Sequence, residues 1–256
     1  MIKNKDAFIK KTDVCNFNTI KNFLDEGGNP NYIFDNKNSL VAQLMNEYWQ
    51  DKLHERDCFK IVNLLLSRGA DPNVRDSNSL TPLHWATHLS LKLTKLFLKN
   101  GAHINIMDRE GFTPLHNAAG SGLARHKKIT KLLLDYGAEI YSIAINVYHY
   151  SVLYDAVAAG NYQIIRMLLK QDMKKGKILL EMIEEKYGRT SLHLAVLNPL
   201  HSSIKIITLL LKHGANIYAK DFEGVTPFQI VSKFASPRYL KVRELFIKYK
   251  RKAKAN

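Results

Sequence analysis

Two short motifs alternate along most of this 256-residue chain, and their recurrence constrains the fold more than any other feature of the sequence. The first is LTPLHWA at 80–86, which returns as FTPLHNA at 112–118, RTSLHLA at 189–195 and VTPFQIV at 225–231. The second is LLLSRGADPN at 64–73, which returns as LFLKNGAHIN at 96–105, LLLDYGAEI at 132–140 and LLLKHGANI at 209–217. Self-similarity with a period of about 20 to 50 residues is typical of arrays in which each unit contacts only its neighbours.

Each motif contains residues that begin or end a helix. In the first motif, the Thr81 hydroxyl suits an N-cap, Pro82 suits the first helical turn, and the small Ala86 lets a neighbouring helix lie close. The leucine run of the second motif supplies the apolar stripe of another helix. Gly69 follows that run where a left-handed residue ends the helix. The two motifs therefore predict a pair of helices in each unit.

These motifs resemble the ankyrin repeat, which has a usual period of about 33 residues and a T-P-L-H-x-A signature. The resemblance extends over residues 3–250 or so, which is almost the whole chain. It implies an all-α ankyrin-repeat solenoid of about seven helix-turn-helix units, with short finger hairpins and a concave binding face.

We interpret residues 1–256 as a single ankyrin-repeat domain. Counting from the two motifs places the repeats at 3–35, 36–76, 77–108, 109–144, 145–185, 186–221 and 222–254. The last of these has no following Gly-Ala pair, so we interpret it as a C-terminal cap.

The fifth repeat, 145–185, is atypical. Its segment SVLYDAVAAGNYQIIRMLLKQD aligns with the repeat pattern without a gap, and Ser151 and Tyr154 take the places of the motif Thr and His. The following segment MKKGKILLEMIEEK, however, places apolar residues among charges where the other repeats have turn residues. We expect residues 172–186 to form an added helical turn or a short helix instead of a hairpin.

Nothing in the sequence indicates catalysis. A repeat array leaves no room for a separate catalytic domain, and no P-loop, GxGxxG, HExxH or metal-spaced Cys/His set is present. We therefore predict a nonenzymatic protein with no metal and no cofactor. The resemblance implies that the recurring His84, His116 and His193 hydrogen-bond backbone between neighbouring repeats. Cys15 and Cys58 are too few for a disulfide framework, which favours a reducing, intracellular setting.

The ankyrin family usually grips partners with its finger tips and the inner face of the first helix of each repeat. The resemblance therefore implies a set of partner-binding candidates, and its aromatic members form a predicted ladder across the fingers. The alternative is that several of these rings pack between adjacent fingers. The candidates are Arg75, Asn78, His88, Arg109, Glu110, Phe112, Tyr148, Tyr150, Tyr187, Arg189, Phe222 and Glu223.

The chain is strongly basic, with a formal net charge of +15 and a pI near 9.6. This charge is consistent with an acidic protein partner. The alternative is binding to nucleic acid or an anionic membrane through the basic surface and the tail RYLKVRELFIKYKRKAKAN. Lysine-rich codon usage and a solvated outer face explain the same charge without a partner, and composition does not separate these readings.

The Lys/Asn/Ile-rich composition and the irregular repeats look like ankyrin proteins of intracellular bacteria or large viruses, which often act on host proteins. No F-box-like segment of the poxviral type is evident at the C-terminus, so the bacterial effector reading is favoured. We expect an intracellular, cytosolic protein, which as a bacterial effector would be delivered into a host cell, with the nucleus as an alternative because of the terminal KYKRKAK cluster.

Overall fold

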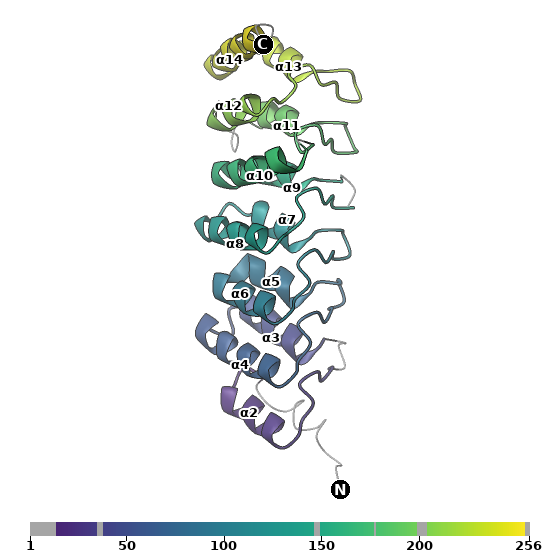
Figure 1. The fold of residues 1–256 in the computed structure, drawn as a ribbon, viewed down its shortest axis with the longest axis vertical. Coiled ribbons are helices and arrows are strands. Elements are labelled where there is room, and N and C mark those ends of the chain that lie inside the picture. Colours follow the sequence, from purple (N-terminus) through teal and green to yellow (C-terminus); the bar gives the residue numbers. More distant parts are fainter. Residues whose placement is uncertain (1–13, 35–37, 146–148, 177, 199–203, 254–256) are drawn as a thin grey trace. The chain divides into compact units, whose positions relative to one another are not determined.

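The computed structural model describes residues 14–34, 38–145, 149–176, 178–198 and 204–253, and these residues form thirteen α-helices (Figure 1). The all-α prediction is therefore confirmed. In chain order the helices are α2 Phe17–Asp25, α3 Leu40–Trp49, α4 Glu55–Ser67, α5 Pro82–Leu89, α6 Leu91–Lys99, α7 Pro114–Ala119, α8 Ala124–Asp135, α9 Val152–Ala158, α10 Tyr162–Lys175, α11 Ser191–Leu197, α12 Ile204–Lys212, α13 Pro227–Lys233 and α14 Pro237–Ala253.

Contacts between residues divide the chain into two compact units. Unit 1 comprises residues 1–109 together with 135–137, and unit 2 comprises residues 110–134 together with 138–256. Within each unit, the first helices of successive pairs lie in one layer and the second helices lie in another (Figure 1).

In unit 1, consecutive helices pair and the pairs stack on one another. Helix α3 packs against α4 and α5 packs against α6, while α3 also contacts α5 and α4 contacts both α2 and α6. The core fills the space between the layers, where the side chains of Leu44, Ile61, Leu83 and Phe97 are fully buried. Burying one such side chain stabilises a fold by about 1.5–3 kcal/mol, so the apolar stripe of each helix holds the stack together.

Unit 2 repeats this arrangement. Helices α9 and α10, α11 and α12, and α13 and α14 form pairs, and α7, α9, α11 and α13 contact one another in succession. The same holds for α10, α12 and α14. The stripe predicted for the second helix of the fifth repeat is buried, since Ile164, Ile165, Leu168 and Leu169 are at most 1% exposed. The atypical fifth repeat thus keeps the packing of its neighbours.

The TPLH motif begins the first helices as the sequence predicts. Thr81 and Thr113 are N-caps, and α5 and α7 begin at the prolines that follow them. The N–H of each capping threonine donates to the side chain three residues later. The pairs are Thr81 with His84 Nδ1 at 3.1 Å, Thr113 with His116 Nδ1 at 3.2 Å, Thr190 with His193 Nδ1 at 3.1 Å and Thr226 with Gln229 Oε1 at 2.8 Å.

Extended fingers connect the helix pairs. Antiparallel bridges close three of them, at Ile33 with Ser39, Ile143 with Ser151 and Ile183 with Thr190. Neighbouring fingers in one unit are also joined through backbone: the Arg109 N–H donates to the Asn78 carbonyl at 3.0 Å, and the Phe222 N–H donates to the Tyr187 carbonyl at 2.8 Å. Since these bonds fix the backbone, they fix the direction of the finger side chains.

The prediction for residues 172–186 is confirmed only for its first part. Helix α10 does run on to Lys175, which supplies an added helical turn, but Gly176 at φ +136° ends it. Residues 179–181 then form a turn, and Ile183 begins a finger that is bridged to Thr190. The apolar residues that suggested a helix have a different role, because Leu179 and Leu180 are buried against the core.

No helix among the described residues is both long enough and apolar enough to cross a bilayer.

Candidate functional site

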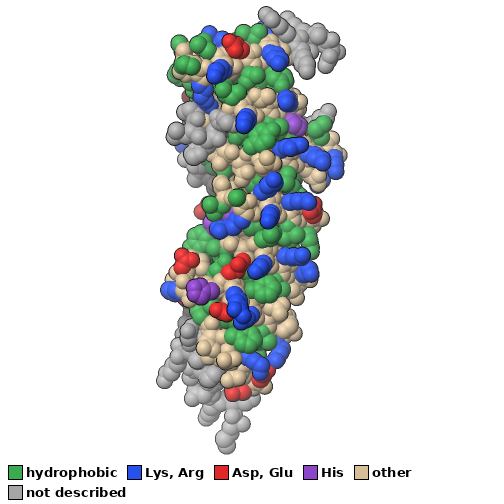
Figure 2. Space-filling model, turned by 90° about the vertical axis from the view of Figure 1, so that its left-hand side faces the viewer, with side chains coloured by type: hydrophobic (Ala, Val, Ile, Leu, Met, Phe, Trp, Pro, Cys, Tyr) green, Lys and Arg blue, Asp and Glu red, His purple; other side chains and the backbone are tan. Residues whose placement is uncertain are grey.

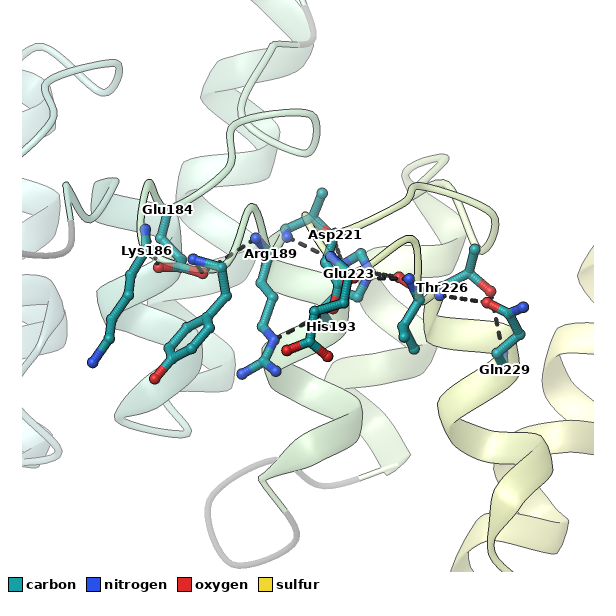
Figure 3. A network of polar contacts seen from close by, with 11 residues as sticks. Glu184, Lys186, Arg189, His193, Asp221, Glu223, Thr226 and Gln229 are labelled. Carbon is teal, nitrogen blue, oxygen red and sulfur yellow. Dashed lines mark hydrogen bonds and ion pairs between the residues drawn. The ribbon is translucent and has the colours of Figure 1, made fainter.

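A buried carboxylate organises the finger that joins the fifth and sixth repeats. Glu184 is only 2% exposed, and it accepts hydrogen bonds from the backbone N–H groups of Lys186 at 3.0 Å, Tyr187 at 2.9 Å and Arg189 at 3.2 Å. Its own N–H donates to the Arg189 carbonyl at 3.0 Å, which closes the finger. The three donating residues are therefore held in one rigid turn (Figure 3).

The next finger repeats this device with Asp221, which is 6% exposed. Its carboxylate accepts from the N–H groups of Glu223 at 3.1 Å and Val225 at 2.8 Å. The second carboxylate oxygen lies 3.7 Å from Arg189 Nε, which forms an ion pair between the two fingers (Figure 3). His193 Nε2 contacts the Val225 carbonyl at 3.1 Å and adds a second link.

Two positively charged side chains lie beside the Tyr187 ring. Arg189 Cζ lies 4.4 Å and Lys186 Nζ lies 5.0 Å from the ring centroid, and both distances are within the range of cation–π attraction. The Tyr187 side chain is 38% exposed. One face of this finger therefore offers an aromatic surface together with two cations.

Phe222 extends the aromatic surface onto the next finger. It is 63% exposed, and its backbone is bonded to that of Tyr187. Its ring lies over Gly188, where an added Cβ would come within 2.4 Å of the ring. We call Lys186, Tyr187, Arg189, Phe222 and Glu223 the Tyr187–Phe222 patch. The sequence had named four of these five residues as partner-binding candidates, and the structure brings them together.

Two other predicted aromatic contacts pack inside their own repeats. The Phe112 ring is half-buried and meets His116 edge-on at 5.8 Å. The Tyr150 ring stacks on Tyr154 at 4.9 Å with an angle of 8° between the planes. Tyr148 lies outside the described residues. The predicted ladder is therefore continuous in the structure only at Tyr187 and Phe222.

Tyr154 occupies the place of the motif histidine, as the alignment predicts. Its backbone N–H donates to the Ser151 hydroxyl at 3.2 Å, and Ser151 is the N-cap of α9. Burial raises the pKa of the Tyr154 hydroxyl, so it stays protonated at neutral pH. Tyr154 is thus a packing residue of the repeat.

The unit 1 candidates lie on two fingers and one helix. Arg75, Asn78 and Arg109 are exposed on the fingers, and Arg75 Nη1 donates to the Met107 carbonyl at 3.0 Å. Glu110, the first residue of unit 2, is also exposed. His88 is half-buried on α5.

Unit 1 contains an aromatic cluster that the sequence did not predict. Trp49, at the end of α3, is 45% exposed, and its ring lies 5.5 Å from that of Trp85 and 4.8 Å from that of His88. Trp85 Nε1 also donates to Asp76 at 3.3 Å. The spacing could not identify Trp49, because the second repeat lacks a TPLH motif and contains extra residues.

The family model described as ankyrin repeats (3 copies) matches residues 53–144, 95–177 and 144–221. Together these matches span residues 53–221, which is more than half of the chain. The chain belongs to the ankyrin repeat family. The family resemblance carried by the TPLH and Gly-Ala motifs is confirmed.

Solved ankyrin structures share this fold at low sequence identity. The ankyrin repeat domain of Bcl-3, a unique member of the IkappaB protein family, is 20% identical with a TM-score of 0.68, and the match covers 93% of this chain and 96% of that chain. The human ASB11 ankyrin repeat domain is 20% identical with a TM-score of 0.67, and coverage is 96% of both chains. A chain from the complex of the predatory endopeptidase Bd0816 of Bdellovibrio bacteriovorus with the immunity protein Bd3460 is 21% identical with a TM-score of 0.63, covering 78% of this chain and 96% of that one. No curated protein matches the sequence.

The ankyrin repeat domain is a noncatalytic fold, and such domains generally bind proteins. The titratable groups of this chain agree with that role. Nδ1 of each motif histidine accepts a backbone N–H, so these rings are engaged in structure. Burial raises the pKa of the Cys58 thiol to about 12, so it is not a nucleophile at neutral pH. The described residues contain no group of three or more His, Cys, Asp or Glu side chains that could hold a metal ion.

Proposed function

We propose that this chain is a noncatalytic module that binds a protein partner, with the Tyr187–Phe222 patch at the centre of the contact. The observation that carries the proposal is the exposure of two aromatic rings on fingers whose backbones are fixed. Aromatic side chains that are already ordered lose little conformational entropy on binding, and Tyr and Arg are enriched among hot-spot residues.

The charges around the rings indicate the chemistry of the partner. Lys186 and Arg189 place two cations against the Tyr187 ring, and the net charge of the chain is +15. Glu223 is the exposed anion of the patch. This arrangement suits a partner surface with an apolar centre and mainly acidic residues at its rim.

The remaining predicted contacts have secondary roles in this proposal. Arg75, Asn78 and Arg109 provide a polar finger surface in unit 1, beside the Trp49–Trp85–His88 cluster on its first helices. Glu110, Phe112, Tyr148 and Tyr150 stay predicted contacts of unit 2. Two of these rings are already packed against neighbours, so we place less of the binding free energy on them.

The identity of the partner is a further part of the proposal. The composition supports a host protein bound by a cytosolic effector of bacterial origin. Solved structures of similar fold come from human and bacterial sources alike, so the fold does not favour one origin.

Affinity capture with matched variants tests the proposed patch. The test variant combines Tyr187→Ala with Phe222→Ala, and the control variant combines Tyr136→Ala with Phe234→Ala. The control removes the same two residue types from sites that are 45% and 47% exposed and lie outside the fingers. Each hot-spot truncation costs about 2 kcal/mol or more, so we expect the test variant to bind a captured partner at least a hundredfold more weakly, on the order of 4 kcal/mol in total.

The readout is the Kd of the captured partner, measured by titration calorimetry against wild type and both variants. Circular dichroism spectra of both variants should match the wild-type spectrum, because all four side chains are exposed. Equal affinity of the wild type and the test variant would contradict the proposed patch.

A further inference from the structure

The second helices of unit 2 carry a large excess of positive charge on their outer side. Figure 2 shows this side of the molecule, on which Lys and Arg side chains outnumber Asp and Glu. Helices α8, α10 and α12 contain only two acidic residues, Asp135 and the buried Asp172. Their exposed cations are Arg125, Lys127, Lys128, Lys131, Arg166, Lys170, Lys174, Lys175, Lys205 and Lys212.

None of these cations is in an ion pair with another described residue. Helices α2 and α4 of unit 1 differ, because Lys21 and Arg68 both pair with Asp25 and Lys60 pairs with Asp57. Unpaired like charges on neighbouring helices repel one another and weaken the fold. An anionic surface would remove this repulsion. We propose that the outer face of unit 2, formed by α8, α10, α12 and α14, binds an anionic phospholipid membrane.

Apolar side chains are interleaved with the cations on this face. Along α14, Leu240, Lys241, Glu244, Ile247 and Lys248 are all exposed at spacings that place them on one side of a helix. Leu240 is 45% exposed and Ile247 is 38% exposed. A basic helix face with protruding aliphatic residues is typical of segments that lie in the membrane interface.

Helix α10 has the same pattern. Met173 is 56% exposed and lies between Lys170 and Lys174 on the outward side of the helix. The unbranched methionine can reach past the phosphate level while its lysine neighbours remain at that level. Two helices of one unit thus combine cations with aliphatic side chains on their outward sides.

A hollow between α12 and α14 provides a place for a single lipid. Its volume is about 300 Å³, and it is lined by Ile204, Lys241, Glu244, Leu245 and Lys248. With Glu244 counted, the two ammonium groups still leave the hollow with a net positive charge that suits a lipid phosphate, whereas the two aliphatic side chains suit the start of the carbon chain next to it. This combination fits an amphiphile.

Nucleic acid fits the face less well. Proteins that bind single strands add aromatic side chains on which the bases stack, and phosphate contacts alone need no aliphatic residues. The hollow has no aromatic side chain in its lining, and Met173, Leu240 and Ile247 would gain nothing from a phosphate backbone. The aliphatic residues therefore decide between a membrane and a nucleic acid.

Vesicle co-sedimentation of the full chain tests the proposal. The vesicles are phosphatidylcholine alone or phosphatidylcholine with roughly a third phosphatidylserine. We expect binding only to the anionic vesicles, with loss of binding when the ionic strength rises about tenfold.

Two variants of equal charge locate the binding face. The test variant combines Lys131→Gln, Lys170→Gln and Lys248→Gln, and the control combines Lys21→Gln, Lys52→Gln and Lys60→Gln. Each cation near an anionic surface contributes about a fivefold increase in binding, so we expect the test variant to lose roughly a hundredfold. The control removes the same net charge from ion-paired lysines, and we expect less than about a threefold loss.

A third variant, Met173→Gln with Leu240→Gln, distinguishes binding to a membrane from binding to a nucleic acid. It should lower binding to anionic vesicles about tenfold, because both aliphatic side chains leave the interface. Three outcomes would overturn the proposal: no binding to anionic vesicles at low salt, equal loss in the two lysine variants, or binding to duplex DNA that exceeds vesicle binding and is unchanged in the third variant.

Discussion

The finger built on Asp76 in unit 1 and the finger built on Glu184 in unit 2 use the same device with different carboxylates. The Asp76 carboxylate accepts from the N–H groups of Asn78 and Leu80, each at 2.9 Å, and the Asp76 N–H donates to the Leu80 carbonyl. The Glu184 carboxylate likewise accepts backbone N–H groups across its turn. In both fingers, the charge of the side chain is used to hold the backbone.

The Glu184 finger is one residue longer before its capping threonine. The longer glutamate side chain reaches across the larger turn and accepts a third N–H. The fingers also differ in where the aromatic surface lies. Asp76 binds Trp85, an aromatic residue of the following helix, whereas the Glu184 finger carries Tyr187 on its own turn. The finger with the added residue therefore carries an aromatic side chain itself, whereas the aromatic side chain next to the Asp76 finger lies on the following helix.

Removing the carboxylate should show how strongly each finger depends on it. We expect Glu184→Ala to lower the free energy of unfolding by about 3 kcal/mol, because three backbone N–H groups lose their acceptor at a site that is 2% exposed. Asp76→Ala should cost roughly half as much, because Asp76 is only half-buried and water can replace it. Urea unfolding followed by circular dichroism measures both changes. Equal losses in the two variants would show that the fingers are equivalent after all.

The Asp76 and Glu184 fingers also differ at the position two residues before the capping threonine. Ser79 in the Asp76 finger and Gly188 in the Glu184 finger both have a positive φ, of +60° and +69°. A side chain is present in the first, but in the second the Phe222 ring occupies the space. We expect Gly188→Ala to cost about 1–2 kcal/mol of unfolding free energy and to displace the Phe222 ring.

Gly224→Ala is the matched control for this variant. Gly224 lies at φ +75° in the Asp221 finger, and no atom would lie within 4 Å of an added Cβ. This control has the same backbone strain without the clash. If the proposed patch binds the partner, Gly188→Ala should weaken binding about tenfold while Gly224→Ala should not. Similar Kd values for the two variants would show that the position of the Phe222 ring is unimportant.

Much of the fold could be predicted because each motif contains residues that begin, bury or end a helix for a known physical reason. A threonine cap followed by proline begins a helix, a leucine stripe is buried, and a glycine after the stripe ends the helix. These signals are local, so they are readable without the structure. The segment 172–186 shows the limit of this approach. Two of its apolar residues, Leu179 and Leu180, are buried in a turn, whereas Ile178 is exposed. Sequence periodicity cannot distinguish this arrangement from a helix.

The candidate site could be predicted only in part. Counting from the TPLH motif identified Tyr187, Arg189 and Phe222 as finger residues. The count gave no sign of Glu184 as the organising residue, because the finger is one residue longer than the Asp76 and Asp221 fingers and its acid is a glutamate. The position of the Phe222 ring over Gly188 depends on two fingers at once. Contacts of this kind require the structure.

The helices that follow the Glu184 and Asp221 fingers begin with different capping residues, and only one of these residues titrates near neutral pH. His193 follows the Glu184 finger, and Gln229 follows the Asp221 finger at the same capping position. Burial lowers the pKa of His193 below its ordinary value of 6.5, so the folded state favours the neutral ring. The stabilisation from this group is therefore present above pH 6.5 and is lost as the pH falls through the lowered pKa of the folded state.

We expect His193→Gln to reduce this dependence on pH, since a glutamine side chain accepts the capping N–H at any pH, as Gln229 does at 2.8 Å. Between about pH 7 and pH 5, the wild type should lose more unfolding free energy than the variant, because only the wild type must keep a ring neutral that the unfolded chain protonates. Urea unfolding at both pH values measures the difference. An identical pH dependence in the two proteins would mean that protonation of His193 does not affect the unfolding free energy. Histidine and glutamine would then be equivalent at this capping position.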